Sequence, residues 1–350
     1  MSTTSARFSK FVRPEAPRNG VITERDLDIV EVILRYRFSP TSEMVRLVGG
    51  NEKVTLRRLR QLWEWGYVNR FAFPGIRNHS EFSYYLDTTK SLDLLLQHGR
   101  AAEIHPHMEE EIKLNREADY AGAVMRGQHM KLGFLQHSLM VSRMHFMLEM
   151  SSRNPANGIS FAAWRQGAEL RGHKAEVPEI HSRRIEGTNK YAWEERDNHM
   201  QKLPVEPDAL FSLGLAGDRL SHFCYEADRG TMSAADMLKK FRAYYHFVKR
   251  QQKHREAFGV HPIRAVLIET TAEPRARKLM ELVEQVAVIG ESSQSGLFWF
   301  CISPLFGASL EAGDMPSTSR YLTEPQSILQ PVWALPDFTL HSLQDAENQT

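Results

Sequence analysis

The chain has few of the features that mark secreted or membrane proteins. It contains only two cysteines, Cys224 and Cys301, and both lie in apolar runs, so we expect reduced core residues and no disulfide framework. Two cysteines without clustered histidines also argue against a structural zinc site. We find neither an apolar run of about 18 residues, as a membrane span requires, nor an amino-terminal signal core. We therefore expect a cytoplasmic protein with no membrane partner.

The sequence also lacks a global excess of charge. Its 44 Lys and Arg residues against 43 Asp and Glu residues leave a formal net charge of +1. Affinity for nucleic acid would therefore have to come from local patches. A small-molecule enzyme has little support, because there is no Gly-rich phosphate loop and no nucleophile motif. At 350 residues without an internal repeat, the chain is long enough for two folded domains.

The amino-terminal third predicts three helices and a β-hairpin. After an expected flexible arm over 1–20, Thr23 begins a helix, with Asp26 completing a capping box. A second helix starts at Thr41, and a third runs from about Asn51 to Gly66. Two β-like runs over 67–73 and 81–86, joined by a short basic loop, precede a helix over 88–97. This order is the plan of a winged helix-turn-helix, which we assign to 21–100.

The third helix has an apolar face and a basic face. The side chains predicted to enter the core are Leu56, Leu59, Leu62 and Trp63. The opposite face, predicted to enter the major groove of double-stranded DNA, carries Lys53, Arg57, Arg58, Arg60 and Gln61. Arg70, Arg77 and His79 would place the wing on the DNA backbone. The alternatives are a helix whose arginines merely face water and a winged helix used for protein contacts.

The middle of the chain predicts a linker and the start of a second domain. Mixed charges over 101–130 favour a helical linker, and the second domain is expected over 131–305. A long buried helix begins near Lys131, and a strand follows over 159–164. Residues 172–202 carry many charges and few apolar anchors, which predicts a long exposed loop, either mobile or contacting nucleic acid through Arg183, Arg184 and Lys190. Residues 306–350 are expected to form a loosely patterned tail.

A hairpin over 208–226 brings acidic residues together. Two β-like runs, 208–215 and 220–226, flank a turn in which Gly217 is able to adopt positive φ. Folding the chain back about Gly217 places Asp208 opposite Glu226, and Asp228 shares the strand face of Glu226. Three carboxylates so close repel one another unless a proton or a cation intervenes. Oxygen-rich clusters of this kind suit Mg²⁺ or Mn²⁺.

The next helix would bring a lysine to these carboxylates. Ser233 and Asp236 form a capping box, and an apolar face follows. Lys240 flanks that face, whereas Lys239 points away from it, so Lys240 is the better candidate to contact the acids. A strand around 266–268, a helix over 275–288 and a strand over 296–302 then predict a parallel pair with a crossover. The second domain is thus expected to contain a mixed central sheet with helices on both faces.

Several short motifs resemble the replication-relaxation family of bacterial mobile-element proteins. They are Thr23-Glu-Arg-Asp26, Arg57-Arg-Leu, Gly66, Tyr84-Tyr-Leu86, Pro207-Asp208, Glu226-Ala-Asp228-Arg-Gly230 and Lys240-Phe-Arg-Ala-Tyr244, and the resemblance covers most of 22–305. It implies an α+β chain in which a winged helix-turn-helix precedes an α/β domain similar to the restriction-endonuclease-like PD-(D/E)xK fold. It also implies a role in plasmid or integrative-element biology. Asp228 departs from the nuclease pattern, because a lysine is usual there; in some similar folds the following helix supplies it, here as Lys240.

Two functions follow from these expectations. In the first, the chain is a Mg²⁺- or Mn²⁺-dependent DNA endonuclease. Asp208, Glu226 and Asp228 would hold the metal, Lys240 would assist catalysis, and Glu169 would complete the shell. In the second, it is a non-catalytic DNA-binding regulator or replication accessory protein. Its nuclease-like domain would then serve dimerisation, giving a homodimer, or partner docking.

Overall fold

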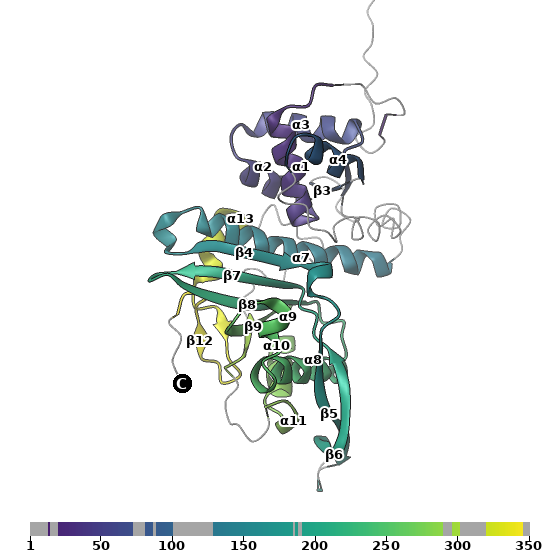
Figure 1. Ribbon diagram of the computed structural model, residues 1–350, viewed down its shortest axis with the longest axis vertical. Coiled ribbons are helices and arrows are strands. Elements are labelled where there is room, and N and C mark those ends of the chain that lie inside the picture. Colours follow the sequence, from purple (N-terminus) through teal and green to yellow (C-terminus); the bar gives the residue numbers. More distant parts are fainter. Residues whose placement is uncertain are drawn as a thin grey trace, which may run out of the picture. The chain divides into compact units, whose positions relative to one another are not determined.

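The computed structural model describes residues 13–14, 20–72, 81–86, 89–100, 129–184, 186–187, 191–289, 296–301 and 320–345. Two compact units meet within helix α7 (His129–Ser152), one ending at Ser142 and the other beginning at Arg143. The predicted linker, 101–130, lies almost entirely outside the described ranges. No helix in those ranges is both long and apolar enough to cross a membrane. The predicted α+β class is confirmed by the helices and the mixed sheet described below (Figure 1).

The first unit contains the predicted helices and hairpin. The helices are α1 (Glu24–Tyr36), α2 (Thr41–Val48), α3 (Glu52–Glu64) and α4 (Thr89–Gln97). Strands β2 (Val68–Ala72) and β3 (Phe82–Leu86) pair antiparallel. A two-residue strand that the sequence did not predict, β1 (Ser39–Pro40), pairs with β3 and gives a three-stranded sheet of order β1-β3-β2.

Local capping explains where α1 and α3 begin. The carboxylate of Asp26 accepts hydrogen bonds from both the backbone and the hydroxyl of Thr23, at 2.7 Å each, which closes the predicted capping box of α1. The side chain of Asn51 accepts from the backbone N–H of Val54 at the start of α3. Gly66 follows α3 with φ of 79°, the left-handed conformation that ends a helix at low cost for glycine.

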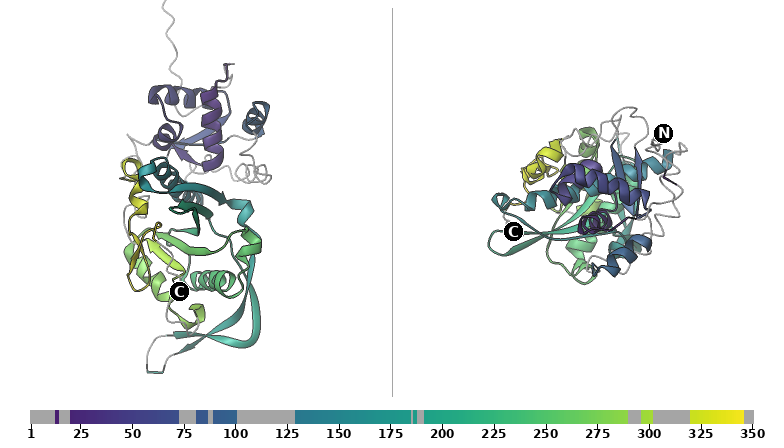
Figure 2. Two further views of the ribbon diagram at one scale, coloured as in Figure 1. Left: turned by 60° about the vertical axis from the view of Figure 1, so that its left-hand side comes forward. Right: turned by 90° about the horizontal axis from the view of Figure 1, so that it is seen from above.

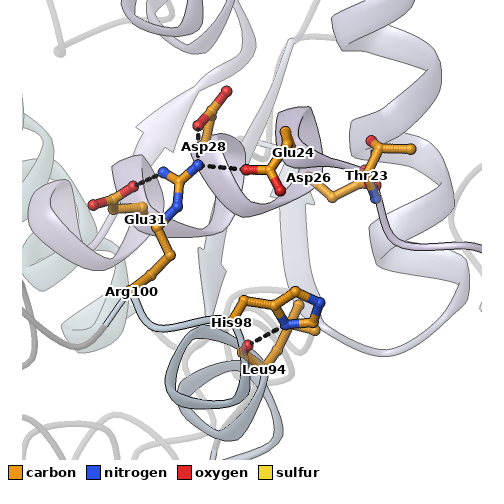
Figure 3. A network of polar contacts seen from close by, with 8 residues as sticks. All are labelled: Thr23, Glu24, Asp26, Asp28, Glu31, Leu94, His98 and Arg100. Atoms are coloured by element: carbon orange, nitrogen blue, oxygen red, sulfur yellow. Dashed lines mark hydrogen bonds and ion pairs between the residues drawn. The ribbon is translucent and has the colours of Figure 1, made fainter.

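An ion-pair network fixes α4 to α1. Arg100, just after α4, contacts Glu31 at 2.6 Å, Glu24 at 2.9 Å and Asp28 at 3.0 Å, and these carboxylates all lie on α1 (Figure 3). The three acids lie at helical spacings of four and three, so they share one face of α1. Because Glu24 is 80 % exposed, we expect this network to orient the two helices more than it stabilises them.

The second unit is built on a seven-stranded mixed sheet of order β12-β11-β10-β9-β8-β7-β4. The strands are β4 (Ser160–Gln166), β7 (Ala209–Leu215), β8 (Arg219–Asp228), β9 (Ile263–Thr270), β10 (Phe298–Cys301), β11 (Trp333–Ala334) and β12 (Leu340–His341). Strands β8, β9 and β10 are parallel, which confirms the predicted crossover, and the other pairs are antiparallel.

Helices cover both faces of this sheet, as expected. One face packs against α8 (Ala234–Tyr245), the π-helical η4 (His246–Arg250), α10 (Glu273–Val283) and α11 (Val286–Ile289) around a buried apolar core. The carboxyl-terminal half of α7 covers the other face, where His145 stacks on Trp164 with ring centroids 4.3 Å apart (Figure 1). Short helices, α9 (His254–Phe258), α13 (Arg320–Thr323) and η6 (Pro325–Leu329), complete the described part of the unit.

The prediction of a long loop over 172–202 is wrong. This stretch forms an antiparallel two-stranded ribbon, β5 (Lys174–Arg184) with β6 (Tyr191–Pro204). The ribbon extends away from the sheet past α8 and α11 (Figures 1 and 2). At its base Ala175 and Val177 are fully buried, whereas further along Arg183 pairs across the strands with Glu194 at 2.6 Å. The charges that suggested a loop are thus cross-strand partners. Lys190 lies outside the described residues.

The segment expected to be a tail, 306–350, also contributes to the fold. Its described part, 320–345, supplies β11 and β12 at one edge of the large sheet. Trp333 is fully buried, and its partner in the antiparallel pairing of β11 with β10 is Cys301. Strands of two residues leave almost no periodic signal, so the sequence pattern did not reveal them.

Candidate functional site

The predicted register of the acidic hairpin is confirmed. Ala209 pairs with Tyr225 and Leu215 with Arg219, about a turn in which Gly217 has φ of 78°. The next position of that register sets Asp208 opposite Glu226. The backbone N–H of Asp208 donates to Tyr225 at 3.1 Å, and its carboxylate accepts from the backbone N–H of Ala227 at 2.9 Å. Asp208 therefore holds the end of β8 with both its backbone and its side chain.

Glu226 is the centre of this site. Its side chain is buried, Nζ of Lys240 lies 2.5 Å from one carboxylate oxygen, and the hydroxyl of Tyr244 donates to the other. Both partners lie on α8, one helical turn apart, so a single helix supplies a cation and a hydroxyl to the same carboxylate. Burial raises the pKa of Glu226 to about 7, with Asp208 adding to the rise and Lys240 and Tyr244 opposing it.

Asp228 is held by a different set of partners. Arg275, in the first turns of α10, donates to both of its oxygens, at 2.8 and 3.1 Å. The hydroxyl of Thr270 on β9 and the backbone N–H of Gly230 add hydrogen bonds of 3.1 Å each. The position where a strand lysine was expected therefore carries a carboxylate that is paired with an arginine. Arg275 and Thr270 were not predicted, because their proximity depends on β9 lying beside β8.

The remaining predicted catalytic residue is Glu169. It lies in the short helix η3 (Gly167–Leu170), directly after β4. The last residue of β4, Gln166, pairs with Ala209, so Glu169 is at the same end of the sheet as Asp208. Tyr244, in contrast, was not among the predicted catalytic residues, and its contact with Glu226 makes it part of the site.

As they lie, these carboxylates do not fit a magnesium or manganese ion. Both oxygens of Glu226 accept from Lys240 and Tyr244, and both oxygens of Asp228 accept from Arg275. Within the described ranges, no group of three or more His, Cys, Asp or Glu side chains is arranged to hold a metal ion. The repulsion expected among the three acids is relieved by side-chain cations from α8 and α10. A metal would have to displace at least one of those cations.

Helix α3 carries the second candidate site. Lys53 and Arg57 are exposed, and neither has a partner among the described residues, whereas Arg60 pairs with Glu64 at 2.8 Å. The core face differs from the prediction at one position. Leu59, Leu62 and Trp63 are buried, but Leu56 is 38 % exposed beside the basic residues, and Thr55 takes its place inside. The polar face of α3 therefore includes an exposed leucine.

Three further predicted DNA-binding residues lie in fixed surroundings. Arg58 donates to the buried carboxylate of Asp26 and to the side chain of Gln61. Arg70 on β2 stacks over Trp63 at 3.6 Å and Phe82 at 4.2 Å from the ring centroids, and burial lowers its pKa. Arg77 and His79, the predicted wing contacts, lie outside the described residues.

A buried ion pair lies on the other face of the large sheet from Glu226. Arg143 on α7 donates to Glu269 on β9, and the hydroxyl of Tyr225 donates to the other oxygen of Glu269 at 2.6 Å. All three side chains are buried, and burial raises the pKa of Glu269 to about 7 while Arg143 and Tyr225 oppose that rise. This network has no access to solvent, so we assign it to stability.

Comparison with known proteins gives one match. A family model described as replication-relaxation matches residues 31–262, which is more than half of the chain. The match begins within α1 and ends just before β9, so it includes α3, the acidic hairpin and α8. No curated protein and no solved structure matches the sequence.

Proposed function

The chain belongs to the replication-relaxation family, which associates it with the replication of mobile elements, and we propose that it acts there by binding duplex DNA. In this proposal the first unit is a winged helix-turn-helix that places α3 in the major groove. The observation that carries the proposal is that Lys53 and Arg57 are exposed on α3 and have no partner in the part of the chain that the structure describes. DNA phosphates would pair with these two cations and be neutralised by them.

The arrangement around α3 supports a nucleic-acid partner over a protein partner. Lys53 and Arg57 are four residues apart and therefore share one face of the helix. With a net charge of +1 for the whole chain, such a local concentration of cations is the feature that would attract a polyanion. Leu56, exposed on the adjoining face, is able to contact a thymine methyl group in the same groove.

Duplex binding by the full chain tests this proposal. Fluorescence anisotropy with a labelled random-sequence duplex at low salt measures the affinity of the wild type and of Arg57→Ala. We expect Arg57→Ala to bind with a Kd that is roughly several-fold higher, because one phosphate contact is lost. Lys239→Ala is the matched control, since Lys239 is also an exposed cationic residue of a helix but lies in the second unit. Equal affinity of all three proteins would contradict the proposal.

The contacts of the acidic residues support a non-catalytic role for the second unit. Glu226 and Asp228 are already paired with Lys240 and Arg275, and Asp208 accepts from the backbone N–H of Ala227. A satisfied polar network of this kind rigidifies a fold. We therefore propose that the nuclease-like unit serves partner docking or dimerisation, giving a homodimer. Asp208→Ala is then expected to leave duplex affinity unchanged. A loss of affinity in that variant as large as in Arg57→Ala would contradict this division of roles.

Cleavage of DNA is the second candidate, and one observation favours it. Lys240 reaches Glu226 from α8, as it would if it replaced the lysine missing from the strand. Asp208, Glu226, Asp228, Lys240 and Glu169 would then form the catalytic set. The test is incubation of the pure protein with supercoiled plasmid and Mg²⁺ or Mn²⁺. Nicking that is lost in Asp208→Ala would establish this candidate, and no nicking with either metal would reject it.

A further inference from the structure

Arg58 is held in place by a fully buried acid of the first unit. Asp26 has no exposed surface, and Arg58 donates to both of its oxygens, one of them from Nε at 2.6 Å. The guanidinium also donates to the backbone carbonyl of Val21 at 2.9 Å and lies 5.1 Å from the ring centroid of Trp65. Breaking a bidentate pair with a buried carboxylate would leave that charge uncompensated. Arg58 is therefore fixed in the protein and not available to contact bases.

The same guanidinium determines how Gln61 is oriented. A third nitrogen of Arg58 donates to the side-chain oxygen of Gln61 at 2.9 Å. Since a guanidinium carries only donors, the amide of Gln61 has to turn its oxygen toward Arg58. Its amine group, with two N–H donors, then points away from the guanidinium. The orientation of this amide thus follows from its neighbour.

Gln61 lies in line with Lys53 and Arg57, the exposed cations of α3 described above. Lys53, Arg57 and Gln61 follow one another at intervals of four residues, so they form one stripe along the helix. Lys53 and Arg57 are exposed, and Gln61 is half-buried because its oxygen side faces Arg58. The stripe therefore presents two cations followed by the amide N–H donors of Gln61.

We propose that Gln61 contacts DNA as a donor only, and that Asp26 and Arg58 are the positioning residues that make it so. This inference rests on the proposed binding of duplex DNA through α3. A glutamine with a free amide contacts adenine through both of its atoms, accepting from N6 and donating to N7. With its oxygen engaged by Arg58, Gln61 donates instead to the acceptors of the major groove, which are purine N7, guanine O6 and thymine O4. It rejects cytosine, whose major-groove group is the N4 amine donor.

The preference at one base position is the measurement that tests this inference. The full chain is used to select duplexes from a random-sequence library, and the selection is repeated with Gln61→Glu. Glutamate keeps an oxygen for Arg58 but has no N–H donor, and it accepts from cytosine N4. We expect the wild type to exclude cytosine at one position and Gln61→Glu to prefer it there. We also expect roughly 10-fold weaker binding of the variant to the wild-type sequence.

Two further variants separate positioning from simple loss of structure. Gln61→Met has no donor and no charge, and is expected to lose the exclusion of cytosine without gaining a preference for it. Arg58→Lys keeps a cation beside Asp26, but a single ammonium does not hold Asp26 and Gln61 together. In that variant the freed amide of Gln61 is expected to favour adenine over the other accepted bases, because it then contacts adenine through both its oxygen and its nitrogen, while thermal unfolding confirms that the first unit remains folded.

The outcomes distinguish this inference from the function on which it rests. If the wild type enriches no duplex, the proposed DNA binding fails and the inference fails with it. If the wild type enriches a sequence and the three variants enrich the same sequence with the same preference at every position, DNA binding stands and the donor-only role of Gln61 is overturned.

Discussion

The ammonium of Lys240 lies 2.5 Å from the carboxylate of Glu226, which is fourteen positions earlier and on a different element of the second unit. This contact brings a lysine of the following helix to the acidic strand. It also changes the interpretation of the site. The lysine, together with Tyr244, occupies both oxygens of the acid that a metal would need.

The stability of the second unit should fall as pH rises through neutrality. Because burial raises the pKa of Glu226 from 4.5 to about 7, the folded chain keeps a proton that the unfolded chain has already released. The stabilisation is complete below about pH 4.5 and is lost as pH rises through about 7. Urea denaturation should show that the free energy of unfolding declines between about pH 5 and pH 8. Glu226→Gln should make this decline smaller by up to about 3 kcal/mol.

Burial also raises the pKa of Glu269 to about 7. We expect this group to cause the part of the decline in stability that remains in Glu226→Gln. Glu269→Gln is therefore the matched variant, and the two substitutions should reduce the slope additively because the acids lie on opposite faces of the sheet. An unchanged pH slope in Glu226→Gln would show that this carboxyl is not protonated in the folded chain.

Loss of Arg143 should destabilise the second unit strongly. Arg143→Met leaves the carboxylate of Glu269 buried without its guanidinium, which we expect to lower the free energy of unfolding by about 3–5 kcal/mol. Adding Glu269→Gln removes the buried charge and keeps an acceptor for Tyr225, so the double variant should recover most of the loss. Chemical denaturation measures the free energy of unfolding of the single and the double variant. A double variant less stable than Arg143→Met would disprove the role given to the ion pair.

Arg242 should hold the β5–β6 ribbon against α8. Its fully buried guanidinium donates to the backbone carbonyl of Pro178 on β5 at 2.9 Å and to Glu195 on β6 at 3.0 Å. Arg242→Met is expected to speed amide hydrogen exchange throughout 174–204, because both strands lose their anchor. Lys239→Met, an exposed change on the same helix, is the control. Equal exchange in the two variants would mean that the apolar base alone fixes the ribbon.

The acidic site should bind Mn²⁺ poorly unless its cation is removed. In the wild type, Lys240 and Arg275 compete with the ion for Glu226 and Asp228, so we expect little heat on calorimetric titration with MnCl₂. Lys240→Met frees one oxygen of Glu226 opposite Asp208 and should bind Mn²⁺ more tightly. The opposite result, tight binding by the wild type that Asp208→Ala abolishes, would favour the endonuclease candidate.

The sequence predicted elements whose signals are local. The caps at Thr23, Asn51 and Ser233 and the turn at Gly217 depend on neighbouring residues, so the helices and the acidic register followed from them. The ribbon was not predicted, because its charges are satisfied across strands and its apolar anchors are confined to its base. A charge-rich stretch with few apolar residues is typical of a loop when the cross-strand partners are unknown.

The partners of the candidate-site residues could not be predicted, because they come from segments that are distant in the sequence. A helical wheel places Arg58 on the polar face of α3, but it does not show that Asp26, on another helix, is buried beneath it. In the same way, Asp228 was predicted as a possible ligand, and only the position of β9 and α10 beside β8 shows that Arg275 holds it. Leu56 was placed in the core because helix periodicity does not reveal how wide the buried stripe is.

The salt dependence of duplex binding tests the central claim most directly. Each phosphate contact contributes about 0.9 to the slope of log Kd against log salt concentration. For the double variant Lys53→Ala/Arg57→Ala the account predicts weaker binding at every salt concentration and a slope lower by about 2, with Lys239→Ala equal to the wild type. A double variant that keeps both the wild-type affinity and the wild-type slope would show that α3 is not the DNA-binding surface.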